Sequence, residues 1–278
     1  MGAAALRRAW AAETASGRAR AAALPDRSVL RWTLIPAAAL LAIALLLVLS
    51  GGYHAGFAAL NGLFPLLPPR LWAVMSALGD TATALALLLF LLPGRWHLAW
   101  IGLIATLLGL AFTHGLKHSL DLPRPAGVLP PEAFHGLGDL AAGQSFPSGH
   151  SQTVLTLAAV AMLATASPVL RAALVATGLV LAGSRVPVGM HWPIDVLVGA
   201  AGGLLCVLLA AWLARRSLWG IGWLATALMT GLGVTAALML VAGHPAAYPG
   251  AAPVMLPLGA AALIRTARSG IAAARGPA

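Results

Sequence analysis

Long apolar runs, separated by short polar segments, dominate the pattern of this 278-residue chain. A membrane-spanning helix needs roughly 20 consecutive apolar residues, and runs close to this length recur from one end of the sequence to the other. The pattern therefore predicts an all-α, polytopic transmembrane helical bundle. The expected spans are about 32–50, 72–92, 97–116, 149–167, 169–184, 193–214 and 219–242, with a weaker eighth candidate at about 245–264.

Three polar interruptions refine this pattern. Residues 51–71 are rich in proline, which breaks helices, and predict an external loop. Residues 118–147 form the longest interruption and predict a second external loop with a short helix near 131–141. Asp80 falls inside the second run, where an unpaired charge is costly. We expect Asp80 and Thr81 to cap a shorter helix there, the alternative being that Asp80 faces a polar interior.

The composition agrees with a membrane protein. The chain is 60% hydrophobic and 9% charged, whereas a soluble domain carries about 25% charged residues. The net charge of +10 does not indicate a nucleic-acid partner, because the arginines cluster in short loops and tails that flank the apolar runs. The single cysteine, Cys206, allows no intrachain disulfide.

The positive charges also predict an orientation. With the N-terminus inside, thirteen of the seventeen lysines and arginines fall on cytoplasmic segments, as the positive-inside rule requires. The four on the outside are Arg70, Lys117, Arg124 and Arg185. We therefore expect a cytoplasmic tail at 1–31, a membrane core at 32–214 of about six spans, and one or two further spans with a cytoplasmic tail at 215–278.

The first of three polar motifs is Lys117-x6-Arg124-Pro125, at the external end of the third run. Arginine offers a planar fork of donors to a phosphate, and lysine acts as a point charge. Taken alone, Lys117 is better explained as an interfacial lysine whose stem lies along apolar surface.

The second motif, Pro147-Ser148-Gly149-His150, opens the fourth run. Helix N-termini present unpaired N–H groups and a partial positive charge, which suit a phosphate, and Gly149 permits close approach of the backbone. The alternative for this motif is an ordinary serine cap followed by an interfacial histidine.

The third motif is Ser184-Arg185-x5-His191-x3-Asp195. A histidine and an aspartate four residues apart can meet across one helical turn. A carboxylate that accepts the proton of one ring nitrogen leaves the other nitrogen as a nucleophile. A carboxylate at a helix start is also a common cap.

In their order and spacing, the three motifs resemble the three-part signature of the type 2 phosphatidic acid phosphatase (PAP2) family. The resemblance covers the motif region, about 117–195, and the helical pattern of roughly 72–214. It implies that His191 is a nucleophile that forms a phosphohistidine, that Asp195 orients it, and that His150 is the acid for the leaving group. It also implies that the phosphoryl oxygens are bound by Lys117, Arg124, Ser148, Gly149 and Arg185, with no metal and no other cofactor.

The expected protein is thus a metal-independent phosphatase in a bacterial inner membrane, acting on a lipid phosphate or diphosphate monoester at the periplasmic face. Its partners would be the bilayer and the lipid substrate, not nucleic acid. Two alternatives stay open at this point: a lipid phosphotransferase that uses the same phosphohistidine, and a transporter with an anion site.

Overall fold

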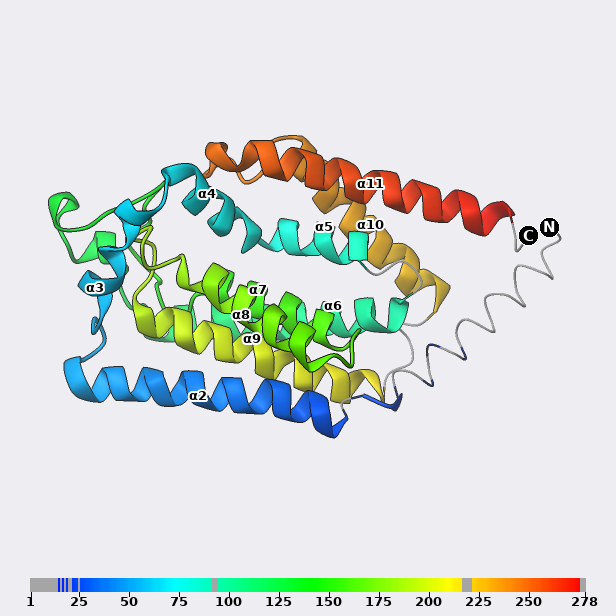
Figure 1. Cartoon of the computed structure of the whole chain (residues 1–278), viewed down its shortest axis with the longest axis horizontal. Coiled ribbons are helices and arrows are strands. Elements are labelled where there is room, and N and C mark those ends of the chain that lie inside the picture. Colours follow the sequence, from blue (N-terminus) through cyan, green and yellow to red (C-terminus); the bar gives the residue numbers. More distant parts are fainter. Residues whose placement is uncertain are drawn as a thin grey trace.

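The described residues form a helical bundle without strands (Figure 1). The computed structural model describes residues 26–91, 95–216 and 222–275, together with 15, 17, 19 and 22–24. The helices are α2 (Arg27–Gly51), α3 (Phe57–Asn61), α4 (Pro69–Leu78), α5 (Thr81–Leu91), α6 (Trp96–Leu120), α7 (Gly149–Met162), α8 (Pro168–Gly183), α9 (Pro193–Ala214), α10 (Trp223–Val241) and α11 (Ala252–Arg275). Single 3-10 turns lie at η1 (Phe64–Leu66), η2 (Pro125–Gly127), η3 (Pro131–Ala133) and η5 (Pro249–Ala251). The all-α prediction is confirmed.

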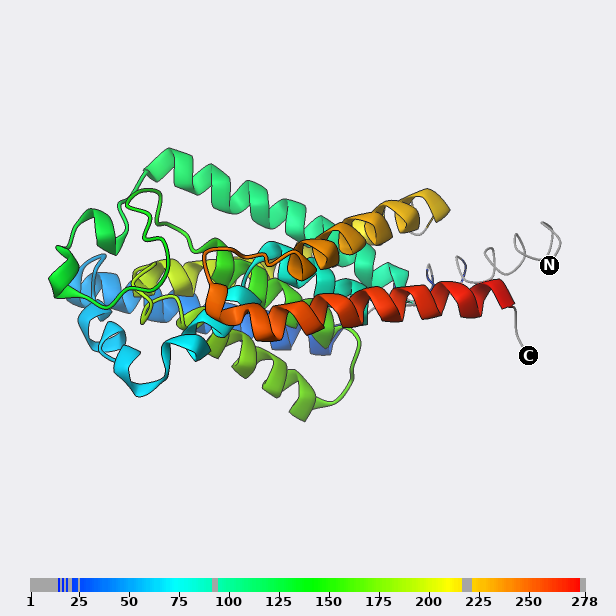
Figure 2. The ribbon, with the colours of Figure 1, turned by 90° about the horizontal axis from the view of Figure 1, so that it is seen from above.

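The helices pack in two groups. Helix α9 lies at the centre of the first group and contacts α2, α6, α7 and α8, whose buried side chains form one apolar cluster. Helices α4, α5, α10 and α11 enclose a second cluster. The connecting loops that carry the polar motifs gather at one end of the bundle in both views (Figure 1 and Figure 2).

Glycines on α9 allow α7 to approach closely. A Cβ atom at Gly199 would lie 2.4 Å from the carbonyl oxygen of Ser148, and one at Gly203 would lie 2.4 Å from that of Gln152. Neither position could carry a side chain without moving the backbone of α7. This contact fixes the start of α7 against the start of α9, and both ends carry motif residues.

The lengths of the helices differ from the predicted spans. In the described part of the chain, three helical segments are long and apolar enough to cross a bilayer, namely Arg27–Gly51, Trp96–Gly127 and Pro193–Ala214. The pair α4 and α5, bent by 69° at residues 79–80, would be a fourth. Helices α7 and α8 have 14 and 16 residues and are shorter than a full span. Pro168 starts α8 soon after α7 ends, so the run predicted at 149–167 holds a shorter helix and a turn.

Of the local predictions, the cap at Asp80 is confirmed and the short helix in the second external loop is wrong. Asp80 does cap a shorter helix, since its Oδ1 accepts the N–H of Ala82 at 2.8 Å. The short helix expected near 131–141 is wrong. Only the 3-10 turn Pro131–Ala133 forms there, and Gly138 adopts a positive φ of 76° that interrupts a helix. Most of the predicted tail at 1–31 lies outside the described residues, but α2 already begins at Arg27.

The surface of the bundle is apolar where a bilayer would touch it. On α2, Ile35, Leu46 and Leu49 expose 66%, 63% and 74% of their surface. A soluble protein does not present such a continuous apolar face. Together with the hydropathy of the long helices, this marks the chain as an integral membrane protein.

Candidate active site

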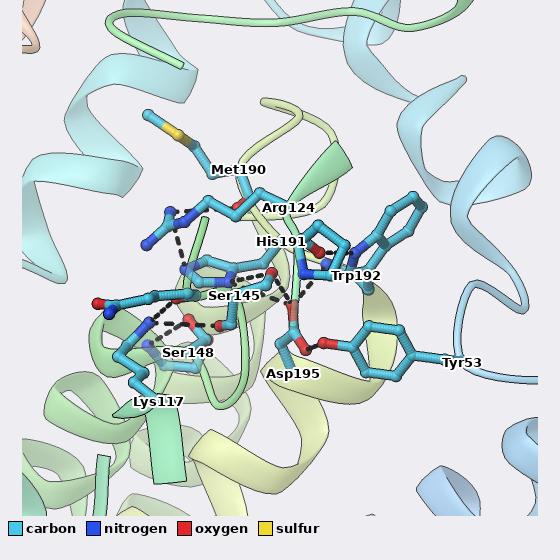
Figure 3. Close-up of polar contacts among 12 residues, drawn as sticks. Tyr53, Lys117, Arg124, Ser145, Ser148, Met190, His191, Trp192 and Asp195 are labelled. Atoms are coloured by element: carbon cyan, nitrogen blue, oxygen red, sulfur yellow. Dashed lines mark hydrogen bonds and ion pairs between the residues drawn. The ribbon is translucent and has the colours of Figure 1, made fainter. Parts of the chain in front are cut away.

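The three polar motifs converge at the loop end of the bundle (Figure 3). Lys117 lies in the last turn of α6, and Arg124 lies in the loop that follows. Ser148 is the N-cap of α7, with Gly149 and His150 in its first turn. Arg185 and His191 lie in the loop between α8 and α9, and Asp195 lies in the first turn of α9.

His191 and Asp195 form a buried pair. With the ring proton on Nδ1, His191 donates to Asp195 Oδ2 at 3.3 Å, and the two side chains are 2% and 0% exposed. The same carboxylate oxygen accepts the backbone N–H of Trp192 at 2.9 Å. This tautomer leaves the lone pair on Nε2, which lies 3.5 Å from Arg124 Nη1. The ring is therefore held with its free nitrogen facing a cation.

Two residues that the sequence analysis missed complete the surroundings of Asp195. Tyr53, in the loop between α2 and α3, donates its hydroxyl to Asp195 Oδ1, and Ser145 donates to Oδ2 (Figure 3). Burial, followed by the nearby charge of Asp195, raises the pKa of Tyr53 far above its usual value, so the phenol stays protonated and remains a donor. Both donors fix the carboxylate that orients His191.

Arg124 and Lys117 are held by backbone carbonyls. Arg124 donates through Nε to Gly143 at 2.9 Å and through Nη1 to Met190 at 3.3 Å. Lys117 Nζ donates to the carbonyls of Gln144 and Ser145. Carbonyls orient these cations without neutralising them, so their charge remains available to an anion.

Arg185 is the most deeply buried of the three cations, at 2% exposure. Its Nη1 donates to the hydroxyl of Tyr248 at 2.8 Å, whereas its Nε has no hydrogen-bond partner in the described part of the chain. Within that same part, none of the three cations forms an ion pair with a carboxylate. Burying an unpaired charge is costly, so this cluster indicates a site for an anionic ligand.

The start of α7 has a more specific arrangement than the sequence predicted. The N–H of Ser148 donates to the carbonyl of Asp195 at 3.0 Å, and the Ser148 hydroxyl accepts from Ser151 Oγ at 2.8 Å. Ser148 thus ties α7 to α9, and its N–H is not free for a phosphate. Gly149 faces open space, so a ligand can approach the first turn of α7 beside it.

His150 lies in that first turn, half-buried, within electrostatic range of Arg185, His191 and Arg124. Its Cβ would be 3.2 Å from a Cβ at Gly79, at the bend between α4 and α5. The absence of a side chain at Gly79 therefore leaves room for the imidazole. All eight residues singled out from the sequence lie at this one end of the bundle.

A large apolar groove of about 540 Å³ lies beside the site, between α2, α4, α8 and α9. Its walls come from the halves of these helices nearest the motif loops. Ser184, Val186 and Pro193, which are sequence neighbours of Arg185 and Trp192, lie along it. The groove thus reaches the loop that carries the third motif.

The surroundings of His191 predict a pH profile. Burial, and then the charges of Arg124, Arg185 and Lys117, hold its pKa well below 6.5. A nucleophilic histidine must be neutral, so we expect the acid limb of kcat/KM to lie below pH 6.5. Arg124→Gln removes one charge, raises this pKa and should move the limb to higher pH, besides lowering the rate. Arg70→Gln, at an exposed position, is the control. Superimposable acid limbs in the two variants would contradict this account.

The site residues lie in a segment that is similar to a known protein family. The model of the PAP2 superfamily matches residues 98–219. The match spans a little less than half of the chain. The match contains all eight site residues predicted from the sequence, whereas Tyr53 and Tyr248 lie outside it. The recognition of the family from its three motifs is therefore confirmed.

Two similar relatives are lipid A 1-phosphatases. The protein of Rhizobium etli is 39% identical over 132 residues, which cover 44% of this chain and 54% of the relative. That of Rhizobium johnstonii is 39% identical over 124 residues, which cover 41% and 48%. The chain thus spans about half the length of the curated relatives it matches.

A solved structure, that of Aquifex aeolicus LpxE, matches with a TM-score of 0.50 and 28% identity. The match covers 55% of this chain and 91% of the LpxE chain. The matched part of this chain thus shares its fold with most of the LpxE chain, and a large part of the present chain lies beyond that match. The bacterial relatives and the apolar helices together indicate a bacterial integral membrane protein.

Proposed function

We propose that this protein is a membrane phosphatase that hydrolyses a lipid phosphate monoester through a phosphohistidine on His191. One observation carries the proposal: the buried His191–Asp195 pair faces Arg124, in a cluster of cations that have no carboxylate partner among the described residues. The names of the PAP2 relatives make the 1-phosphate of lipid A the first candidate substrate.

The geometry supports a two-step phosphoryl transfer. Nε2 of His191 attacks phosphorus, the P–O bond to the lipid breaks, and His150 gives a proton to the departing oxygen. His150 then takes a proton from water, which attacks phosphorus and breaks the P–N bond to release phosphate and neutral His191. Phosphoryl transfer requires mainly alignment and charge stabilisation from the protein.

The stabilising charges come from three directions. Arg124 and Lys117 are fixed by carbonyls of the loop before α7, and Arg185 approaches from the loop before α9. The first turn of α7 adds the partial positive charge of a helix N-terminus. Negative charge that develops on the phosphoryl oxygens would meet a fixed positive environment.

The distribution of arginines supports a periplasmic site with the N-terminus in the cytoplasm. Apart from Arg70, the positive charges assigned to the outer face are the motif residues Lys117, Arg124 and Arg185. A test is the reactivity of single cysteines, one at exposed Ala246 and one at exposed Arg215, toward an impermeant maleimide in intact cells whose native Cys206 is replaced. Labelling at 246 but not at 215 is expected, and the reverse would overturn the orientation.

The apolar groove supports a lipid as the substrate. We assign it to an acyl chain of the substrate, because it reaches the loop of Arg185 and lies in the half of the bundle nearest the site. An acyl chain could lie there while the phosphate occupies the cationic cluster. Burial of each methylene contributes about 0.8 kcal/mol, so the groove would favour long-chain phosphates over soluble ones.

Gly183 offers a direct test of the groove. It lines the groove at the end of α8, and a Cβ there meets nothing within 4 Å. Gly183→Leu should partly fill the groove and raise KM for a long-chain lipid phosphate about tenfold, with little change for a soluble aryl phosphate. Gly231→Leu, at another open helical glycine outside the groove, is the matched control. Equal effects of Gly183→Leu on both substrates would refute the assignment.

The proposed function itself is tested by phosphate release from purified protein in detergent. The panel comprises lipid A 1-phosphate, lipid A 4′-phosphate, phosphatidate, phosphatidylglycerophosphate and undecaprenyl diphosphate. We expect turnover, fastest with lipid A 1-phosphate. Release that occurs only when a second lipid is added as acceptor would indicate a phosphotransferase instead, and no release from any of the panel would overturn the proposal.

A further inference from the structure

Tyr248 contacts the catalytic centre from outside the PAP2 match. It lies in the loop between α10 and α11, some thirty residues beyond the matched segment 98–219, and is 5% exposed. Its hydroxyl accepts a hydrogen bond of 2.8 Å from Nη1 of Arg185, and the Arg185 guanidinium lies 5.6 Å from the centre of its ring. The C-terminal helices thus bring a side chain to a cation of the proposed phosphate site.

Arg185 depends on this contact for its orientation. The guanidinium of Arg124 donates to two carbonyl groups. Within the described residues, the guanidinium of Arg185 forms one hydrogen bond, to the hydroxyl of Tyr248. Its Nε is buried without a partner. An arginine side chain has several rotatable bonds, and fixing them costs entropy. A single directional acceptor from Tyr248 reduces the number of directions in which the guanidinium can point.

Tyr248 is itself firmly placed. At the start of its loop, His244 Nε2 lies 3.1 Å from Oδ1 of Asp80. Asp80 caps α5 and follows Gly79, the glycine that packs against His150. On the other side, a Cβ at Gly138 would lie 2.7 Å from the carbonyl of Ala247. The loop therefore lies against two segments, the α4–α5 bend and the loop before α7.

Apolar packing also connects Tyr248 with the loop that carries the third motif. Val188 and Met190, from the loop that carries Arg185 and His191, are buried in one cluster with Tyr248 and with side chains of α10 and α11. The loop of the third motif therefore rests on the C-terminal helices. A shift of Tyr248 would therefore displace the loop that carries Arg185 and His191, the residues proposed to bind and attack the phosphoryl group.

We propose that Tyr248 is a positioning residue that holds Arg185 for the phosphoryl group, and that the α10–α11 hairpin is therefore part of the active site. The inference rests on the proposed phosphate-binding role of Arg185. Tyr248 contacts the guanidinium of Arg185 and not the lipid. Its loss should therefore weaken phosphate binding more than it slows the attack by His191.

Tyr248→Phe tests this directly, since it keeps the ring and removes the hydroxyl. Loss of a hydrogen bond to a charged group should weaken inorganic phosphate binding about tenfold, and raise KM for the lipid by a similar factor with a smaller change in kcat. Tyr53→Phe, the other tyrosine substitution that the chain allows, should instead lower kcat and leave phosphate affinity within about twofold, because Tyr53 holds Asp195. Ala246→Ser, at an exposed position in the same loop, is the neutral control.

A double-mutant cycle separates positioning from general support of the fold. In an Arg185→Leu background the hydroxyl has lost its donor, so adding Tyr248→Phe should change phosphate affinity less than twofold further. Additive losses would show that Tyr248 does not act through Arg185 and would overturn the inference. So would a Tyr248→Phe protein whose melting temperature falls while its phosphate affinity stays at the wild-type value.

Phosphate binding is measured by calorimetry on the full-length protein in detergent, which requires no turnover. If no lipid phosphate is hydrolysed but phosphate binds and Tyr248→Phe weakens it, the proposed function fails and the inference stands. If lipid phosphates are hydrolysed and Tyr248→Phe binds phosphate as the wild type does, the inference fails and the function stands.

Discussion

His191→Ala is expected to reduce phosphate release from a lipid phosphate by at least roughly 10³-fold, because it removes the nitrogen that we propose attacks phosphorus. The fold should survive, since the substitution removes none of the apolar side chains that form the larger cluster around α9. The rate is measured in single turnover with purified protein in detergent, alongside phosphate affinity. We expect the affinity to change much less than the rate, because the three cations remain in place.

A matched control is His114→Gln. His114 is an exposed histidine on α6, and its ring stacks near that of His118. It should retain wild-type turnover. A phosphorylated species that is stable to base but labile to acid, trapped in the wild type and missing from His191→Ala, would identify the intermediate. Near-normal turnover by His191→Ala would assign the nucleophile elsewhere.

His150→Gln carries the second largest expected effect. A positioned general acid contributes roughly 10²–10⁴-fold, and its contribution is greatest when the leaving group is a strong base. Release from a lipid phosphate, whose alkoxide needs a proton, should fall by that factor. Release from p-nitrophenyl phosphate, whose leaving group needs no proton, should fall far less in the first step.

The measurement for His150 is the ratio of the two first-step rates, followed in single turnover as release of the dephosphorylated lipid and of p-nitrophenol. A loss of the same size on both substrates would mean that His150 binds or aligns the phosphate and does not supply the proton. Gly79→Ala provides an independent check, because a Cβ at that position would lie 3.2 Å from the His150 Cβ and 3.3 Å from its Cδ2. We expect it to reproduce part of the His150→Gln effect by displacing the ring.

The main features of the site could be predicted because each motif lies at the boundary of a helix. Ser148 is followed by α7, and Pro193 and Asp195 start α9, so the local sequence specified both the chemistry and the place of the side chains. Hydropathy and charge then placed all three motifs at one end of the bundle. Helix ends were less predictable, since α7 stops at Met162, well inside an apolar run that continues to 167.

The supporting side chains could not be predicted because their partners are distant in the sequence. Tyr53 meets Asp195 across 142 positions, and Tyr248 meets Arg185 across 63. Neither tyrosine lies in a motif, and an isolated tyrosine in a loop is normally explained by the membrane interface. Only the packing of α2 and of the C-terminal helices against the core reveals what they hold.

The contacts of the two tyrosines bear on how this protein can be shortened. A fragment trimmed to residues 98–219 would retain every catalytic candidate named from the sequence and yet lack both phenols. Such a fragment would keep the proposed nucleophile, His191, but would lose the hydroxyl that donates to Asp195 and the hydroxyl that accepts from Arg185. Engineering or crystallisation of a minimal enzyme should therefore preserve the chain from α2 through α11.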